Sequence, residues 1–548
     1  MTWQRGIVLG MALGLGPQGA ALAEPDSFHL GVQTHFVQGW RLEFLDLVED
    51  MGAQSLRDEL SWPATEPRPG EFDFSTDRAA FLPLAIERDM APLILFTDTH
   101  PDYDDGQTPF SDDAQRAMAR YIRAVLDHYQ PGIARIEVGN EFNSDDFVSG
   151  PFAQDRTRYL AAMLRAVHEE IADTHPQVEF LCTGTHSVAL GFFRALFEQG
   201  ILQYCDALSV HLYRDHPESF EIELGRLTAL MAELGTVLPI HVTEFGKWFD
   251  DPDQAPGFML KMVALMAEAG VAGAWWYALL DQPWWPNMGL HDPDTGTDMP
   301  AADAFRLLQR QLLPLGRPQR IGDSPLDHIY SFGAGGDAIV AWGAPANLIV
   351  EGAQSYLDAR GRPLPPVTEL GHDPVIILGR DLYVQVERAR DLVDTHYSFG
   401  RAPWSYHAHR ADGTQVALDY IDWEWSSSLG DPGLRPLVIS HDWIGGAMFD
   451  TGAYHAIERF TAPVTGSYLV TGRWYHDTPP SGDGADVTVR THDQVLGSGI
   501  VDAQAFHFGP AEVALNAGDT LDFAVGPHLA PGADVIRRAI DIQFPPAP

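Results

Sequence analysis

From about residue 28 to residue 312, short apolar runs alternate with longer segments whose apolar residues recur every three or four positions. The latter spacing is typical of amphipathic helices, as in residues 112–129, 155–172 and 257–269. Several of the short runs are apolar throughout, as strands covered on both faces are. The runs cover residues 29–36, 54–59, 91–97, 133–139, 178–183, 206–211, 238–243 and 271–277. Eight strands alternating with helices predict an α/β fold, a (β/α)₈ TIM barrel over residues 24–315.

The helical pattern stops at a connector containing proline, glycine and arginine, residues 313–320. Beyond it, brief strand-like runs are separated by glycine and proline turns, a texture typical of antiparallel sheets. We expect a small β-sandwich over residues 316–388 and a larger jelly-roll-like domain over residues 389–548. The strands expected in these two regions include residues 338–342, 347–350, 374–377, 454–460, 466–474, 486–491 and 520–525.

The first 23 residues are organised like a secretory signal peptide. Arg5 supplies positive charge, residues 6–16 form a short apolar core, and Ala21-Leu22-Ala23 is a small-x-small cleavage site. The alternative is a membrane anchor, but the apolar run is shorter than the roughly 20 residues that span a bilayer. No later segment resembles a transmembrane helix. We therefore expect a secreted or periplasmic protein without a membrane span.

The chain is strongly acidic, with 76 Asp and Glu residues against 35 Lys and Arg residues and a net charge of −41. This balance argues against binding to nucleic acid or to anionic membrane surfaces. Because the acidic residues are scattered, we interpret the charge as salt adaptation or solubility, with a cationic substrate as the alternative. The two cysteines, Cys182 and Cys205, are too few for a disulfide framework. We expect buried free thiols, with a bridge between neighbouring strands as the alternative.

Two short motifs place a glutamate directly after a β-branched run. IEVGNEFN (residues 136–143) carries Glu141, and HVTEFGKW (residues 241–248) carries Glu244. The carboxyl ends of the strands form the active-site face of a TIM barrel, so both carboxylates are expected at one mouth. A retaining glycosidase needs such a pair, one to protonate the leaving oxygen and one to attack the anomeric carbon. Asn140, directly before Glu141, is suited to hydrogen-bond a sugar hydroxyl beside the reacting carbon.

Further polar and aromatic residues are expected at the same mouth. They are Arg57, His100, His211, Tyr213 and Trp276, at or just after the ends of four other runs, and His35 and Trp248, which would line the same cleft. The structural alternatives are that Glu141 satisfies free N–H groups at a helix start, that His211 is a core histidine, and that the segment around His100 is only a turn.

With these residues assigned, the chain resembles the clan A glycoside hydrolases, whose barrels carry acid/base and nucleophile glutamates after the fourth and seventh strands. The stretch RDELSWPATEPRPGEFDF (residues 57–74) is most similar to glycoside hydrolase family 39, with family 5 next. The resemblance covers about residues 28–312. It implies a (β/α)₈ barrel, a carbohydrate substrate and no metal or other cofactor, because two carboxylates and a water suffice.

The resemblance also implies a role for each residue. Glu141 would be the general acid/base, with a raised pKa, and Glu244 the nucleophile. Asn140 would hold the sugar hydroxyl, Tyr213 would hydrogen-bond Glu244, Arg57 would keep Glu244 ionised, His211 and His100 would contact the sugar or orient neighbours, and Trp276 would form the floor under the sugar. Trp275 and Trp276 cannot both face the interior, because adjacent strand residues point opposite ways, and Trp276 is chosen by its fit to the family pattern.

Tryptophans in the loops beyond the strand ends are candidate sugar platforms, with loop packing as the alternative. They are Trp40, Trp62, Trp248, Trp284 and Trp285. Several platforms together would favour an extended cleft. The C-terminal region also contains aromatic residues, Trp404, Tyr406, Trp423, Trp425 and Trp443, in a texture that resembles jelly-roll carbohydrate-binding modules. The alternative is a structural domain that braces the barrel.

The sequence therefore predicts a secreted retaining glycoside hydrolase, endo-acting on a β-linked polysaccharide by double displacement. An exo-acting β-glycosidase or a transglycosylase is the alternative within catalysis. The alternative of another class is a non-catalytic glycan-binding matrix protein. The presence of both glutamates, with their expected helpers, favours the enzyme.

Overall fold

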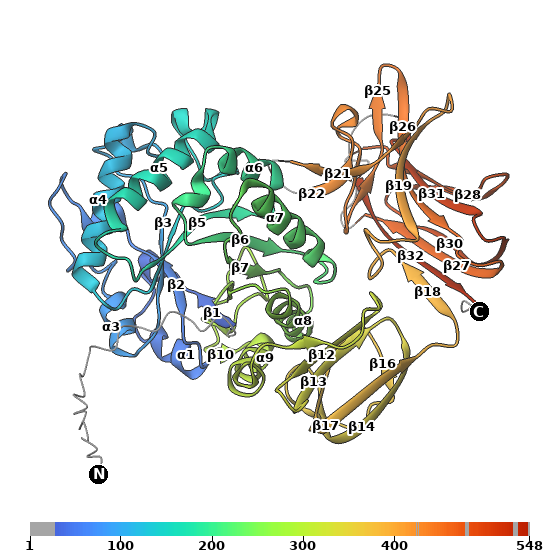
Figure 1. Ribbon diagram of the computed structural model, residues 1–548, viewed down its shortest axis with the longest axis horizontal. Helices are drawn as coiled ribbons and strands as arrows, with labels where there is room; N and C mark the ends of the chain where they lie inside the picture. The colour runs from blue at the N-terminus through green and yellow to red at the C-terminus, as the bar shows by residue number, and fades with distance from the viewer. Residues whose placement is uncertain (1–27, 424, 426, 477–481, 530–534, 546–548) are drawn as a thin grey trace, which may run out of the picture.

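The computed structural model describes residues 28–423, 425, 427–476, 482–529 and 535–545 (Figure 1). The expected signal peptide, residues 1–23, lies outside this part of the chain. A barrel, a curved sheet and a large β-sandwich follow one another along the sequence. Within the described ranges, no helix has both the length and the apolar character needed to cross a membrane.

The eight expected parallel strands close into a barrel in sequence order, which confirms the predicted (β/α)₈ fold. The strands are β1 His29–Gln33, β2 Leu56–Glu59, β3 Leu93–Phe96, β4 Arg135–Val138, β5 Glu179–His186, β6 Ala207–Tyr213, β7 Ile240–Gly246 and β8 Gly273–Trp276. Pairing of β1 with β8 closes the barrel. Burial on both faces explains why these runs are so uniformly apolar.

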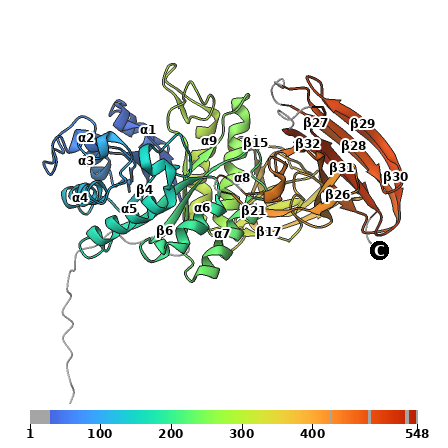
Figure 2. The ribbon, with the colours of Figure 1, turned by 90° about the horizontal axis from the view of Figure 1, so that it is seen from above.

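Helices cover the outside of the barrel (Figures 1 and 2). They are α1 Phe44–Asp50, α2 Trp62–Thr65, α3 Phe81–Glu87, α4 Asp112–Tyr129, α5 Arg156–Ile171, α6 Leu190–Glu198, α7 Phe220–Leu234, α8 Ala255–Glu268 and α9 Pro300–Leu307. Helix α4 begins where Ser111 accepts a hydrogen bond from the Ala114 amide at 3.2 Å, an N-cap that stabilises the first turn.

Alternate strand residues point into the barrel, and Trp275 of β8 is one of them. Its indole packs with Leu93, Leu181 and Ala207 from other strands. Opposite it, a Cβ at Gly31 would lie 2.3 Å from the Trp275 ring, so a glycine is required there. Because neighbouring strand residues face opposite ways, Trp276 must point out of the barrel.

The two cysteines form a disulfide, so the expectation of free thiols is wrong. Cys182 lies in β5 and Cys205 directly before β6, with Cα atoms 5.8 Å apart. The pairing of Leu181 with Ala207 in the barrel brings the two positions together. Closing a loop of this length stabilises a fold by about 3 kcal/mol, mainly through the unfolded chain.

After the barrel, one seven-stranded antiparallel sheet curves around its own apolar core. Its strands are β11 Gln319–Arg320, β12 Asp327–Phe332, β13 Ala338–Gly343, β14 Ala346–Leu357, β15 Pro363–Leu364, β16 Glu369–Leu370 and β17 Val375–Glu387. Register shifts between the long strands β14 and β17 bend the sheet. In a sandwich, two separate sheets enclose the core. Here, the two halves of one hydrogen-bonded sheet enclose it.

The C-terminal body is a sandwich of two antiparallel sheets around a separate core, as expected for a jelly-roll-like domain. One sheet contains β18 Asp391–Asp394, β21 Asp419–Asp422, β22 Ser427–Gly430, β23 Val438–Ile439, β24 Ile444–Gly445, β27 Gly466–Tyr475, β30 Phe506–Leu515 and β32 Val535–Phe544. The other contains β19 Trp404–Arg410, β20 Gln415–Ala417, β25 Ala447–Phe449, β26 Gly452–Thr461, β28 Ala485–Thr491, β29 Val495–Val501 and β31 Thr520–Gly526. Trp404 and Tyr406 belong to the core, so they pack the sandwich and do not present a binding surface.

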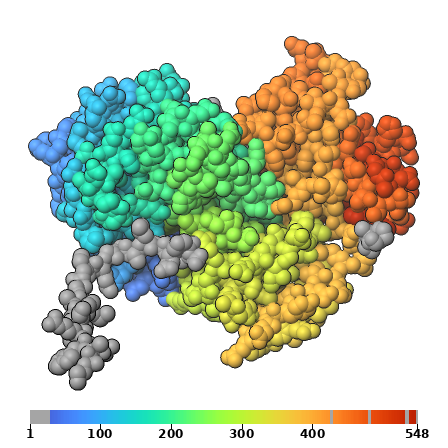
Figure 3. Space-filling model, in the orientation of Figure 1, coloured from blue at the N-terminus to red at the C-terminus, as the bar shows by residue number. Residues whose placement is uncertain are grey.

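A single buried carboxylate joins the three bodies, which lie against one another in Figure 3. Glu218, in the loop after β6, lies 3.1 Å from the Lys261 ammonium group of α8 and accepts a hydrogen bond from the Trp342 indole of β13 at 2.9 Å. It also pairs with His396 of the sandwich at 3.1 Å. Burial disfavours the charges, but the partners outweigh it, so the pKa of Glu218 lies well below its usual value and that of His396 is raised.

Glu218→Gln is expected to lower the free energy of unfolding by about 3 kcal/mol, because it leaves the partly buried Lys261 and His396 without the counter-charge of a fully buried carboxylate. The raised pKa of His396 means that this histidine stabilises the fold below its unfolded pKa and stops doing so as pH rises through its folded pKa. The deficit of the variant, measured by thermal unfolding, should therefore shrink as the solution becomes alkaline. The control is Glu369→Gln, at an exposed position; an equal, pH-independent loss in both variants would contradict the assignment.

Candidate active site

The two motif glutamates meet at the carboxyl ends of the barrel strands. Glu141 follows β4, and Glu244 lies near the end of β7. One carboxylate oxygen of each and one ring nitrogen of His211 all lie within 4.8 Å of one another. About a tenth of each glutamate side chain is exposed, 12% for Glu141 and 11% for Glu244. Retaining glycosidases hold their carboxyl groups about 5–5.5 Å apart and inverting ones at least about 6.5 Å apart, so this spacing suits retention.

Glu244 is held from two sides. Arg57 Nη1 donates to its Oε1 at 2.6 Å, and the Tyr213 hydroxyl donates to its Oε2 at 2.5 Å. Burial and the neighbouring carboxylate raise the pKa of Tyr213 well above its usual value, so the phenol remains a donor. Both donors stabilise the ionised carboxylate and fix its orientation, as an attacking group requires.

Glu137 orients Arg57, and sequence reasoning missed it. Arg57 Nε donates to Glu137 at 2.7 Å, and the Thr243 hydroxyl donates to the other carboxylate oxygen at 2.7 Å. Burial opposes ionisation of Glu137, but Arg57 outweighs it and lowers the pKa. The signal was a second charge in the short run of β4, which also carries Arg135, and the contact with Arg57 shows that Glu137 faces the interior.

Asn140 also belongs to the site. Its side-chain oxygen accepts a hydrogen bond from Arg57 Nη2 at 3.0 Å. Arg57 therefore touches Glu137, Asn140 and Glu244 at once, and its own pKa is raised by the two carboxylates despite burial. One guanidinium fixes the positions of three groups that come from β4, its following loop and β7.

Glu141 is paired with histidines. Its backbone is left-handed, with φ of +50°, and its amide donates to the Gly184 carbonyl at 2.6 Å. His211 Nδ1 lies 2.8 Å from Glu141 Oε1, and His186 Nδ1 lies 3.5 Å from the same oxygen. His186, at the end of β5, was missed by sequence reasoning, although it stands at a strand end as His211 does.

The contacts of Glu141 with His186 and His211 shift the pKa values of the Glu141–His211 pair. Burial alone would raise the pKa of Glu141, but the hydrogen bonds from His186 and His211 outweigh it and hold the pKa well below its usual range. The expectation of a raised pKa is therefore wrong for the free protein. Burial likewise opposes the charge of His211, but Glu244 and Glu141 raise its pKa. In the free protein, the shared proton lies on the His211 side.

Trp276 does not reach the site, so its expected role as the sugar floor is wrong. It is fully buried outside the barrel, its ring lies 6.5 Å from that of Phe258 in α8, and its indole donates to the Met288 carbonyl at 2.8 Å. Tyr277 takes the inward position instead, with its hydroxyl 3.2 Å from His35 Nε2. Burial and Glu244 raise the pKa of Tyr277, so its hydroxyl stays protonated beside the carboxylates.

The other two predicted histidines differ in their surroundings. His35 lines the site beside Tyr277, and burial lowers its pKa to about 4, so it is neutral. His100 is buried in the loop after β3, where Nε2 lies 2.7 Å from the Glu66 carbonyl and Nδ1 accepts from the Asp102 amide at 3.1 Å. With both nitrogens engaged, His100 orders its loop and is not available to a sugar.

Of the predicted loop tryptophans, three are exposed and two are not. Trp248 and Trp285, from the loops after β7 and β8, lie with ring centroids 5.3 Å apart and are 53% and 44% exposed. Trp284, beside them, is 73% exposed. Trp62 is fully buried, and Trp40 packs edge-on against His35. The exposed trio presents an apolar surface on the nucleophile side of the mouth.

The Glu141–His211–Glu244 cluster has the donor types of a metal site. However, the Arg57 guanidinium lies 2.6 Å from Glu244, and a fixed positive charge at that distance repels a cation. His211 already makes a hydrogen bond to Glu141. The arrangement suits proton transfer and nucleophilic attack better than metal binding.

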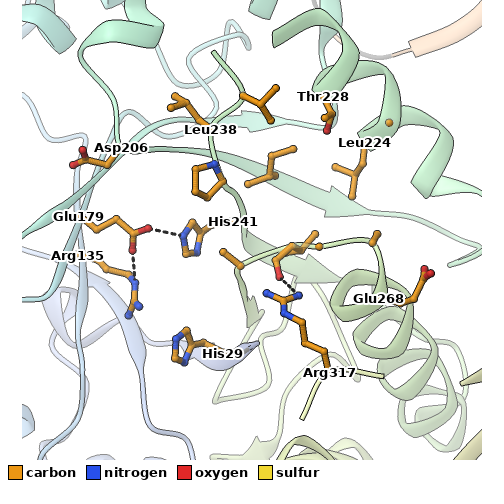
Figure 4. Close-up of a pocket in the computed structure, with 18 of the residues that line it drawn as sticks. His29, Arg135, Glu179, Asp206, Leu224, Thr228, Leu238, His241, Glu268 and Arg317 are labelled. Atoms are coloured by element: carbon orange, nitrogen blue, oxygen red, sulfur yellow. Dashed lines mark hydrogen bonds and ion pairs between the residues drawn. The ribbon is translucent and has the colours of Figure 1, made fainter. Parts of the chain in front are cut away.

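A cavity of about 950 Å³ opens at the amino-terminal end of the barrel (Figure 4). Glu179 accepts from Arg135 Nε at 2.8 Å and lies 3.2 Å from His241 Nε2. Arg317 donates to the Ala267 carbonyl at 2.8 Å. These charges satisfy one another, so we interpret the cluster as one that closes the base of the barrel.

Comparisons with known proteins agree with this fold. No family model matches the chain, and no curated protein matches it. Among solved structures, the chain is similar to a family 39 glycoside hydrolase from Bacteroides cellulosilyticus, with 17% identity, a TM-score of 0.55, and coverage of 65% of this chain and 81% of that one. It is also similar to a family 39 enzyme from Xanthomonas axonopodis pv. citri, with 13% identity, a TM-score of 0.44 and 96% of each chain covered. The first likeness shows that this chain has the fold of a family 39 glycoside hydrolase.

Proposed function

We propose that the protein is a retaining glycoside hydrolase in which Glu244 is the nucleophile and Glu141 the acid/base. The observation that carries the proposal is the close carboxylate pair, one member accepting hydrogen bonds from Arg57 and Tyr213 and the other in contact with His211. The fold likeness supports the same reaction class.

In the first step, Glu244 attacks the anomeric carbon and the glycosidic bond breaks, while Glu141 protonates the leaving oxygen. The proton comes from the His211–Glu141 pair, by transfer across the 2.8 Å contact. Glu244 loses its negative charge as the ester forms, while Arg57 and Tyr213 keep the group oriented. Asn140, fixed by Arg57, is placed to bind the hydroxyl beside the reacting carbon.

In the second step, Glu141 is an anion again and takes a proton from water, which displaces the sugar from Glu244. Esterification removes the negative charge of Glu244, which is the largest factor raising the pKa of His211. His211 is therefore more acidic in the intermediate than in the free protein. When Glu141 has taken the proton from water and Glu244 is a free carboxylate again, the Glu141–His211 pair is back in its starting protonation state.

We further propose endo-action on a β-linked polysaccharide, outside the cytoplasm. The exposed Trp248–Trp285 pair supports an extended cleft, because indole faces stack on the C–H faces of pyranoses. Export rests on the signal-like residues 1–23. Exo-action and transglycosylation remain the alternatives, and product sizes separate them.

The test is a panel of neutral, cationic and anionic β-linked polysaccharides, read by reducing-end release and product sizing, with Glu244→Ala as the blank. Oligosaccharides from one polymer, absent from the blank, would support endo-hydrolysis and identify the substrate. Monosaccharide alone would favour exo-action. Binding without any release, and without hydrolysis of aryl β-glycosides, would instead favour the non-catalytic glycan-binding protein.

A further inference from the structure

The C-terminal sandwich docks on the mouth of the barrel that carries the carboxylates. Asp215, after β6, pairs with Lys247, after β7, at 3.2 Å and with Arg537 of β32. Arg226 of α7 pairs with Asp422 of β21 at 2.9 Å. In Figure 1, β21 and β22 reach the barrel beside α6. The sandwich thus contacts the loop after β6, whose Asp215 also pairs with Lys247, three residues beyond Glu244.

A second contact brings the segment after β21 to the side of Glu141. The Gly191 amide, in α6, donates to the Trp423 carbonyl at 3.0 Å. The Ser187 hydroxyl donates to the Trp425 carbonyl. Ser187 directly follows His186, whose ring lies 3.5 Å from Glu141. Consecutive residues are about 3.8 Å apart, so Trp425 stands within a few residue lengths of the acid/base.

The loop that carries His186 is held in place independently of Trp425. Asn143 accepts from the His186 amide at 2.9 Å and donates to the His186 carbonyl at 3.1 Å. Asn143 belongs to the loop after β4, two residues beyond Glu141. Residues of the loop after β4, of the end of β5 and of the sandwich therefore converge on one side of the carboxylate pair.

The Trp425 side chain is partly free. Its ring lies 5.5 Å from the Arg156 guanidinium, which also pairs with Asp145 of the loop after β4. The side chain remains 39% exposed. A cation–π contact orients an indole without covering all of its apolar surface. An oriented, exposed indole beside an acid/base is suited to stack on a pyranose ring.

We propose that Trp425 is a sugar platform for the leaving saccharide, so that the C-terminal sandwich supplies one wall of the substrate cleft. This inference rests on the proposed function. Glu141 delivers its proton to the glycosidic oxygen, so the leaving saccharide starts at Glu141 and extends over the groups on that side. The Trp248–Trp285 pair, after β7 and β8, lies on the nucleophile side and would serve the other part of the chain.

The test separates leaving-group binding from the rest of the reaction. The protein is trapped with a panel of 2-deoxy-2-fluoro-β-glycosyl fluorides, freed of reagent, and reactivated by water alone or by water with cellobiose or xylobiose. Transfer of the trapped sugar to these acceptors requires a saccharide on the leaving-group side. Trp425→Ala should slow acceptor-driven reactivation about tenfold, as loss of a stacking surface does. Reactivation by water alone should change less than twofold.

Two matched variants complete the design. Ser187→Ala removes the hydrogen bond to the Trp425 carbonyl but keeps the ring, and Tyr383→Ala removes an exposed aromatic ring on β17 of the curved sheet. Both should keep acceptor-driven reactivation within about twofold of the unaltered protein. Three outcomes would overturn the platform: equal losses in Trp425→Ala and Ser187→Ala, no loss in Trp425→Ala, or no acceptor effect in the unaltered protein. In each of them the trapped ester would still form, so the hydrolase assignment would stand. Absence of any trapped ester would overturn both.

Discussion

Glu244→Ala is expected to lower kcat by about 10⁴-fold or more on any true substrate, because the only other carboxylate in the Glu141–His211–Glu244 cluster of the described residues is Glu141, which serves as the acid/base. Arg57 and Tyr213 hold Glu244 on opposite sides and would be left facing a gap. Arg57 keeps its pairing with Glu137, so the buried guanidinium retains a counter-charge and the fold should persist. The measurement is steady-state hydrolysis of the substrate found in the polysaccharide panel.

Two controls make that result specific. Glu87→Ala, at an exposed position at the end of α3, should retain full activity. Thermal unfolding of Glu244→Ala should show a single transition close to that of the unaltered protein. If folded Glu244→Ala kept a substantial part of the activity, Glu244 would not be the nucleophile.

Glu141→Gln is expected to discriminate between leaving groups. Loss of a general acid costs about 10²–10⁴-fold for substrates whose leaving oxygen needs a proton. Dinitrophenyl glycosides need little protonation, so their first step should be nearly unaffected, and the slow second step should produce a burst of released phenol. The measurement is kcat/KM on the natural oligosaccharide and on the dinitrophenyl glycoside, with rapid mixing to see the burst.

The control for this prediction is His100→Gln, because His100 is tied to loop carbonyl and amide groups and does not touch the carboxylates. It should reduce the two activities in proportion if it reduces them at all. A loss in Glu141→Gln that is equal for both substrates would refute the acid role of Glu141.

Much of the fold was predictable because burial on both faces leaves uniform apolar runs. All eight barrel strands appear where these runs occur, and α4 spans Asp112–Tyr129 as its periodicity predicts. The positions of Glu141 and Glu244 at strand ends follow from the same reasoning. The strands, the helix and the strand-end glutamates each depend on the sequence of their own segment, so the sequence alone predicts them.

The predictions fail where the structure depends on a one-residue shift within a strand or on a contact between residues that are distant in sequence. Trp275 fills the barrel interior, so the inward-facing residue at the mouth is Tyr277 and not Trp276. The family pattern was therefore assigned one residue early, which in a strand exchanges the two faces. The disulfide likewise depends on the pairing of β5 with β6, which brings Cys182 and Cys205 together.

The electrostatics of the site was also beyond sequence reasoning. The motif around Glu141 suggests an acid with a raised pKa, but the structure surrounds it with His186 and His211, which lower it. His211 of β6 was expected at the same mouth, but not as a direct partner of Glu141, and His186 of β5 was not expected there at all. The proton needed for catalysis is held by the Glu141–His211 pair and not by Glu141 alone.

The role of Glu244 as the nucleophile is tested by the mass of the intact protein after incubation with the 2-deoxy-2-fluoro-β-glycosyl fluoride panel, followed by peptide mapping. We expect one added fluorosugar, located on Glu244 and absent from Glu244→Ala. A fluorosugar on another residue would contradict the assignment of Glu244 as the nucleophile. So would hydrolysis of the dinitrophenyl glycoside of the same sugar without any adduct.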